Sequence, residues 1–75
     1  MKTNQKQLRR IACNELITSE GQHLTLQCLT TEKGYVVRVH PLEREEAQTE
    51  WMQGQIKLIK DEGGLCAYYQ GKRLT

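Results

Sequence analysis

Hydrophobic and polar residues alternate along residues 23–30, which read HLTLQCLT. Leu24, Leu26 and Cys28 are each separated by one residue, and this period of two is typical of a half-buried β-strand. The sequence TEKG follows, and it ends in a glycine that can take the positive φ of a tight turn. The next residues, GYVVRVHP, are rich in β-branched side chains, which favour a strand. We therefore predict a β-hairpin over residues 23–41.

A second alternating segment lies near the end of the chain. In residues 55–60, QIKLIK, Ile56 and Leu58 are separated by Lys57, again with the period of a strand. The turn-forming cluster DEGG separates this segment from residues 65–70, LCAYYQ. We predict a second hairpin in this part of the chain.

Two adjacent tyrosines, Tyr68 and Tyr69, could form a binding platform or belong to the core. Successive side chains of a strand point to opposite faces, so these two cannot share a face. If Leu65 points into the core, then Ala67 and Tyr69 also point inward, whereas Cys66 and Tyr68 lie on the second face. We expect at least one of the two tyrosines to be structural.

Two further segments fit more than one element. Residues 10–18, RIACNELIT, fit a strand or a helix that begins at Asn4, and their periodicity does not decide between the two. Residues 42–50 follow Pro41 and begin with acidic side chains, as a helix does at its start, but their apolar positions form a poor stripe. We expect an acidic loop or a short helical turn at residues 42–50.

The length of 75 residues leaves room for one domain with one small core. Apolar residues make up 37% of the chain and charged residues 27%, a composition that allows a folded domain of marginal stability. Together with the predicted hairpins, this favours a mainly β fold, either a small antiparallel β-sandwich or a partly open barrel of about five strands. We expect a single domain over residues 1–75, with residues 1–8 as a flexible or loosely packed basic arm.

The net charge of +2 is too small to indicate a nucleic-acid partner by itself. The first ten residues are basic and residues 43–50 are acidic, and such a dipolar chain suits protein contacts, including self-contacts. The three cysteines are widely spaced and form no ligand motif, and we expect Cys28 and Cys66 to be small buried side chains in a reducing compartment. With no apolar run long enough to span a membrane, the sequence predicts a cytoplasmic protein.

Residues suited to catalysis are sparse. The two histidines, His23 and His40, fall in predicted strands without a nucleophile motif or a metal-ligand spacing around them. The acidic run at 43–50 is typical of a solvated face. We therefore expect a domain that is not an enzyme and has no catalytic residues, no metal site and no cofactor.

One candidate binding face combines basic and aromatic side chains. Arg38, Lys57 and Tyr68 stand in predicted strands, and together they have the composition of a platform for single-stranded nucleic acid. The low net charge and the single aromatic side chain per face make a nucleic-acid partner the less favoured hypothesis.

A second candidate surface concerns self-association. The strand at 55–60 has few of the features that protect the edge of a sheet, and apolar side chains precede it that a small core cannot all bury. A two-fold contact would cover both at once. We expect a homodimer, with an interface that contains Trp51, Met52, Ile56 and Leu58.

Several short sequence motifs occur one after another along residues 9–59. They are a basic residue with an I-x-A strand, a turn glycine and a TE-aromatic-x-x-G segment, here Arg10–Ala12, Gly34, Thr49, Glu50, Trp51 and Gly54. In this order, residues 9–59 resemble the N-terminal β-strands of amidohydrolase-superfamily enzymes, which are metal-dependent hydrolases. The resemblance implies the small β-sandwich that flanks their catalytic barrel, and it favours a strand for residues 9–18. The H-x-H strand that carries the first metal ligands of those enzymes does not occur in these residues.

The preferred hypothesis is a small non-enzymatic β domain that acts through protein–protein or self-association contacts. The first alternative is a small barrel that binds single-stranded nucleic acid. The second, which the resemblance implies, is a detached accessory domain of an amidohydrolase-like enzyme.

Overall fold

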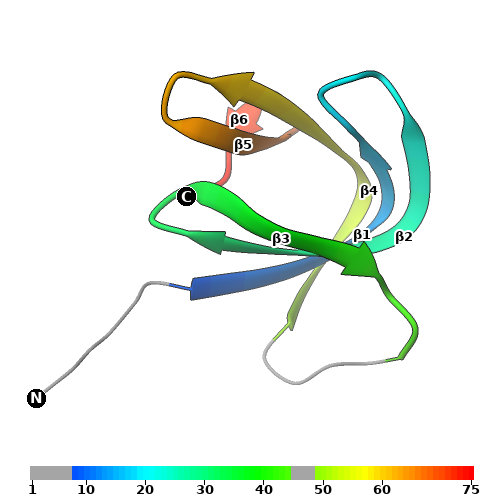
Figure 1. Cartoon of the computed structure of the whole chain (residues 1–75). Coiled ribbons are helices and arrows are strands. Elements are labelled where there is room, and N and C mark those ends of the chain that lie inside the picture. Colours follow the sequence, from blue (N-terminus) through cyan, green and yellow to red (C-terminus); the bar gives the residue numbers. More distant parts are fainter. Residues whose placement is uncertain (1–7, 45–48) are drawn as a thin grey trace, which may run out of the picture.

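The chain folds into β-strands alone in the residues that its computed structural model describes, 8–44 and 49–75 (Figure 1). The strands are β1 (Leu8–Ile17), β2 (His23–Glu32), β3 (Tyr35–Pro41), β4 (Thr49–Asp61), β5 (Gly64–Tyr69) and β6 (Lys72–Arg73). The predicted mainly β fold is confirmed, and so is the strand at residues 9–18. The two-residue strand β6 was not predicted.

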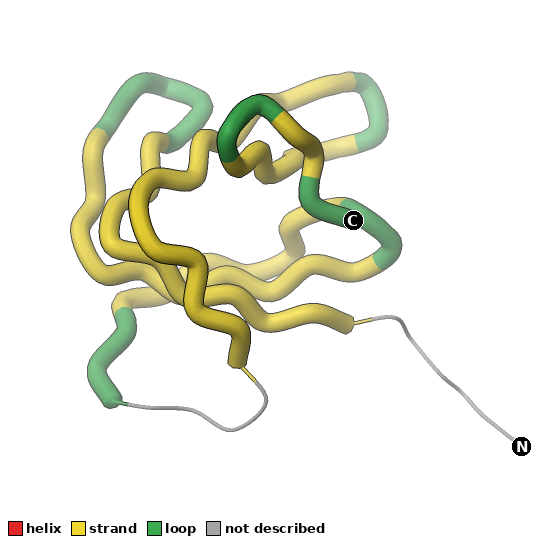
Figure 2. The backbone as a smooth tube through the Cα atoms, turned by 180° about the vertical axis from the view of Figure 1, so that it is seen from behind, coloured by secondary structure: helices red, strands yellow, loops and turns green. Residues whose placement is uncertain are grey.

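All six strands belong to one sheet, in the order β3-β2-β1-β4-β5-β6. Neighbouring strands are antiparallel, except that β1 and β4 are parallel. The sheet curls on itself, so that β3 and β5 come close without becoming hydrogen-bonded neighbours (Figures 1 and 2). The result is a partly open barrel with β3 and β6 at its two edges.

The inner face of the curled sheet holds the core. Its fully buried aliphatic side chains come from the neighbouring strands β1, β2 and β4, namely Ile11, Leu16, Leu29 and Ile56. Ala67 belongs to this core, and Leu65 and Tyr69 pack against it, which confirms the inward orientation predicted for these three residues of β5. Burying such side chains is the main stabilising term for a domain of this size.

Two of the hairpins have tight two-residue turns of the same kind. Lys33 and Gly34 connect β2 to β3 with φ values of 54° and 86°, and Gln70 and Gly71 connect β5 to β6 with φ values of 53° and 81°. Two consecutive positive φ angles are the mark of a type I′ turn, whose twist matches that of the flanking strands. Gly34 therefore adopts the positive φ that the sequence predicts for it.

A bulge bends β4 where it lies beside β1. Cys13 pairs with Met52 and Glu15 with Gln55, so one residue of β1 faces two residues of β4, Gln53 and Gly54. Gly54 has a φ of 110°, which a side chain would strongly disfavour. Such a bulge increases the local twist, and from this point β4 turns towards β5 (Figure 1).

Two expectations about irregular segments fall partly outside the described residues. Of the basic arm expected at 1–8, only Leu8 is described, and it is the first residue of β1. Of the acidic loop or helical turn expected at 42–50, residues 45–48 are not described. Thr49 and Glu50 already belong to β4, because they pair with Arg10 and Ile11 of β1.

Candidate contact surface at the β4 edge

The first half of β4 has a neighbouring strand on one side only. Residues 49–55 pair with β1, whereas β5 begins to pair with β4 at Ile56 and continues to Asp61. Within the described part of the chain, no strand pairs with residues 49–55 on the side away from β1. An edge of this kind can receive a further strand.

Trp51 is the large side chain at this edge. It lies opposite Ala12 of β1 and keeps 51% of its surface exposed. The next residue, Met52, is partly buried and packs against the core. The edge therefore presents an indole on the outer face of the sheet and is held to the core on the inner face.

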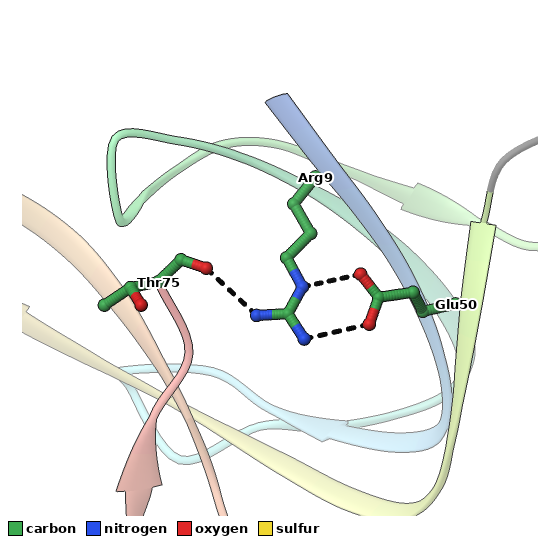
Figure 3. A network of polar contacts seen from close by, with 3 residues as sticks. All are labelled: Arg9, Glu50 and Thr75. Carbon is green, nitrogen blue, oxygen red and sulfur yellow. Dashed lines mark hydrogen bonds and ion pairs between the residues drawn. The ribbon is translucent and has the colours of Figure 1, made fainter. Parts of the chain in front are cut away.

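The start of the edge is anchored by Arg9 of β1 (Figure 3). Its Nε and Nη2 donate to the two carboxylate oxygens of Glu50, at 2.6 and 2.8 Å. Its Nη1 donates to the backbone carbonyl of Thr75, at 3.0 Å. The hydrogen bonds from Arg9 lower the pKa of Glu50, and burial opposes this only in part. Arg9 also lines a shallow hollow together with Leu8, Arg10 and Glu50, and within that hollow its guanidinium is already bound to Glu50.

The four residues predicted for a dimer interface are not on one surface. Ile56 is fully buried and Leu58 is 4% exposed, and both belong to the core of the chain. They are unavailable for a contact with another chain. The predicted surface is thereby reduced to Trp51, with Met52 beneath the edge.

The predicted face of Arg38, Lys57 and Tyr68 is only partly assembled. Lys57 and Tyr68 are direct cross-strand partners on β4 and β5. Arg38 pairs with Thr30 on the other side of the sheet, and β2 and β1 lie between its strand and β4. The second basic residue beside Tyr68 is Arg73 of β6.

Arg73 is committed to the fold. It donates from Nη2 to the carbonyl of Gly34 at 3.1 Å and lies 4.8 Å above the ring centroid of Tyr35. Its pKa is raised, first by a hydrogen bond with Tyr35. The sequence did not single out Arg73, because no pattern predicted a sixth strand that would place it beside Tyr68.

A polar cluster on the outer face joins β1, β2 and β4. Glu15 contacts His23 Nδ1 at 2.6 Å and accepts a hydrogen bond from Gln55 Nε2 at 2.8 Å. These contacts lower the pKa of Glu15, the one from Gln55 most of all. The cluster contains no serine or cysteine nucleophile of the kind that a histidine–carboxylate pair activates.

The fold disfavours the ionised thiolate at two of the cysteines, Cys13 and Cys66. Cys13, Cys28 and Cys66 are buried, as predicted for Cys28 and Cys66. Burial raises the pKa of Cys13 to about 11. The pKa of Cys66 is also raised, first by burial and then by its hydrogen bond to Asp61. Both shifts disfavour the reactive thiolate.

Metal-ligating side chains do not gather in residues 8–44 and 49–75: these contain no group of three or more histidine, cysteine, aspartate or glutamate residues that could hold a metal ion. The same residues contain no helix suited to crossing a membrane. Comparisons with protein-family models, with curated proteins and with solved structures found no match to this chain. The β4 edge is therefore characterised by its geometry and by the exposed Trp51.

Proposed function

We propose that this chain is a non-catalytic β domain that works through protein–protein contacts, and that its first partner is a second copy of itself. The observation that carries the proposal is the half-exposed Trp51 on a stretch of β4 that is paired on one side only. Tryptophan is among the residues most enriched at the energetically dominant positions of protein interfaces. Unpaired strand edges are similarly common sites of association.

The other exposed apolar side chains do not form a comparable site. They are spread over β1 to β4, and comprise Leu8, Leu26, Val37, Val39 and Ile59. Ile59 lies in the part of β4 that pairs with β5. Val37 and Val39 lie two residues apart on the edge strand β3 and have smaller side chains than Trp51. Among the residues that the structure describes, Trp51 is the exposed large apolar side chain on the half-paired stretch of β4. A closed two-fold contact would cover this patch on both copies at once.

Sedimentation velocity over the micromolar concentration range tests the proposal. We expect a concentration-dependent dimer for the wild type and a shift to monomer for Trp51→Arg, because the introduced charge would have to be desolvated in the contact. Ile59→Arg is the matched control, since it places the same charge at an exposed position outside the half-paired stretch. Circular dichroism checks that both variants fold.

A wild type that sediments as a monomer throughout this range would contradict self-association. In that case the fluorescence emission of Trp51, the single tryptophan of the chain, should also stay at the wavelength of a solvated indole at every concentration.

Binding of single-stranded nucleic acid is a second candidate function. Lys57 and Tyr68 lie side by side on β4 and β5, and Arg73 is the next residue in register on β6. An aromatic ring between basic residues can stack on a base, at about 1–3 kcal/mol per base. Retention on heparin and on single-stranded DNA at low salt is the test, with Tyr68→Ala expected to weaken retention and Val37→Ala to leave it unchanged. Absence of any retention by the wild type would remove this candidate.

The role of a detached accessory domain stays a prediction based on the resemblance of residues 9–59 to amidohydrolase N-terminal strands. If the domain retains hydrolase activity, the purified protein should turn over an amide or amidine substrate after zinc is added. A preparation without activity would exclude a hydrolase.

The cytoplasmic location likewise stays a prediction, which fractionation of cells can check.

A further inference from the structure

The backbone of the half-paired stretch of β4 has a defined direction. The hydroxyl of Tyr69, on β5, donates to the carbonyl of Gln53 at 2.7 Å, so this carbonyl points away from β1. The N–H of Gly54 donates to Asn14 Oδ1 of β1 at 2.6 Å, so it points the opposite way. Backbone N–H and C=O groups alternate in direction from one residue of a strand to the next. The backbone groups of Trp51, two residues before Gln53, therefore also point away from β1.

From this direction we infer that a second copy of the chain adds its own β4 edge antiparallel to this one, with the two-fold axis at Trp51. The inference rests on the proposed function, and it names the segment and the register of the contact. Trp51 would pair with Trp51 of the second copy through two backbone hydrogen bonds. The sheets of the two copies would then run on into one another through adjacent β4 strands.

The side chains favour this register over its neighbours. With the axis at Trp51, the carboxylate of Glu50 lies opposite Met52 of the second copy. Moving the axis to Glu50 would place two carboxylates directly opposite one another, which destabilises a strand pair. Moving the axis to Met52 would bring Glu50 opposite Gly54, whose φ of 110° belongs to the bulge that interrupts regular pairing.

The position of Trp51 on the outer face also fits this arrangement. Glu50 is held on the inner side by Arg9, and Met52 packs against the core, so neither has to move. The two indoles would meet as a cross-strand aromatic pair, which stabilises a strand pair relative to a pair of alanines. A contact built on one short strand pair is small, and we expect a weak, reversible dimer.

Disulfide trapping tests the register directly. The Cα atoms of a hydrogen-bonded antiparallel pair are about 5.5 Å apart, within the range that a disulfide spans. We therefore expect the Trp51→Cys variant to form a covalent dimer under mild oxidation. The two Gln53→Cys positions would be about 13 Å apart, since each lies two residues from the axis, and no disulfide can join them. Trapping is cumulative, so it detects a dimer that the loss of the indole has weakened.

Ile59→Cys serves as the control for random collisions, and the native thiols are buried. The inference predicts that Trp51→Cys cross-links at least about tenfold faster than either other variant, because pairing raises the effective thiol concentration. Equal or faster cross-linking of Gln53→Cys overturns the register. A wild type that is dimeric in sedimentation, while Trp51→Cys cross-links no faster than Ile59→Cys, overturns the β4 edge but leaves the proposed self-association standing. A monomeric wild type overturns both.

Discussion

Arg9 shows how one side chain can connect distant parts of a short chain. It joins Glu50 in β4 and the backbone of Thr75 to the start of β1 (Figure 3). The side chains of Arg9 and Glu50 are 30% and 47% exposed, so solvent screens their attraction. The two-pronged geometry nevertheless fixes the guanidinium more firmly than a single contact does.

At the residue scale, Glu50→Gln should lower the free energy of unfolding at neutral pH by about 0.5–1 kcal/mol. The folded chain lowers the pKa of Glu50, so the stabilisation is present above the unfolded pKa of about 4.3 and is lost as pH falls through the folded pKa. The difference between wild type and variant should therefore shrink in acid. Urea unfolding at several pH values measures it.

The control for this prediction is Glu20→Gln, which removes a carboxylate from the exposed turn between β1 and β2. Its effect on stability should be smaller at neutral pH. A Glu50→Gln penalty that stays constant down to strongly acidic pH would contradict the role of the ion pair.

At the scale of elements, the type I′ turns explain why the hairpins have short connections. Lys33 and Gln70 both adopt the left-handed conformation that their side chains disfavour. Each is followed by a glycine that adopts a positive φ without strain. The twist of the flanking strands, and not the preference of the first turn residue, therefore determines the turn type.

This conflict predicts that Lys33→Asn stabilises the chain by roughly 0.5–1 kcal/mol, because asparagine adopts the left-handed conformation more readily. Lys33→Gln is the matched control, since it removes the same charge but retains the strain. Urea denaturation at neutral pH distinguishes the two. The explanation fails if glutamine stabilises the chain as much as asparagine does.

At the scale of the whole molecule, side chains bring the two ends of the strand order together. Tyr35, at the start of β3, stacks with Arg73 of β6 and lies against the turn between β4 and β5. A Cβ atom added at Gly63 would lie 2.3 Å from the Tyr35 hydroxyl oxygen. Since β3 and β6 are not hydrogen-bonded to each other, this cluster holds the curled sheet together where the backbone does not.

We expect Arg73→Gln to lower the melting temperature and to accelerate amide exchange at the turn between β2 and β3, because the contact with the Gly34 carbonyl is lost. Lys72→Gln, an equal change of charge at the neighbouring exposed residue, should leave exchange at that turn unchanged. Gly63→Ala should act in the same direction as Arg73→Gln by displacing Tyr35, at a cost of about 1–3 kcal/mol. Identical amide exchange in the Arg73 and Lys72 variants would show that Arg73 does not hold the turn between β2 and β3 in place.

The sequence by itself determined the elements whose cause is local. Alternation of apolar residues marked the strands at 23–30 and 55–60, and glycine marked the turn at Gly34. The opposite orientations of Tyr68 and Tyr69 followed from the geometry of a strand alone. These features follow from the pattern of neighbouring residues in the sequence.

Only the tertiary structure decided which strands lie side by side. The parallel pairing of β1 with β4 makes residues 49–55 a strand, although their apolar positions form no regular stripe. Strand order also places Arg73 of β6 beside Tyr68. The core takes Ile56 and Leu58 and leaves Trp51 at the surface. The physical reason is that a strand's exposure depends on which neighbours cover its faces and edges, and those neighbours are distant in sequence.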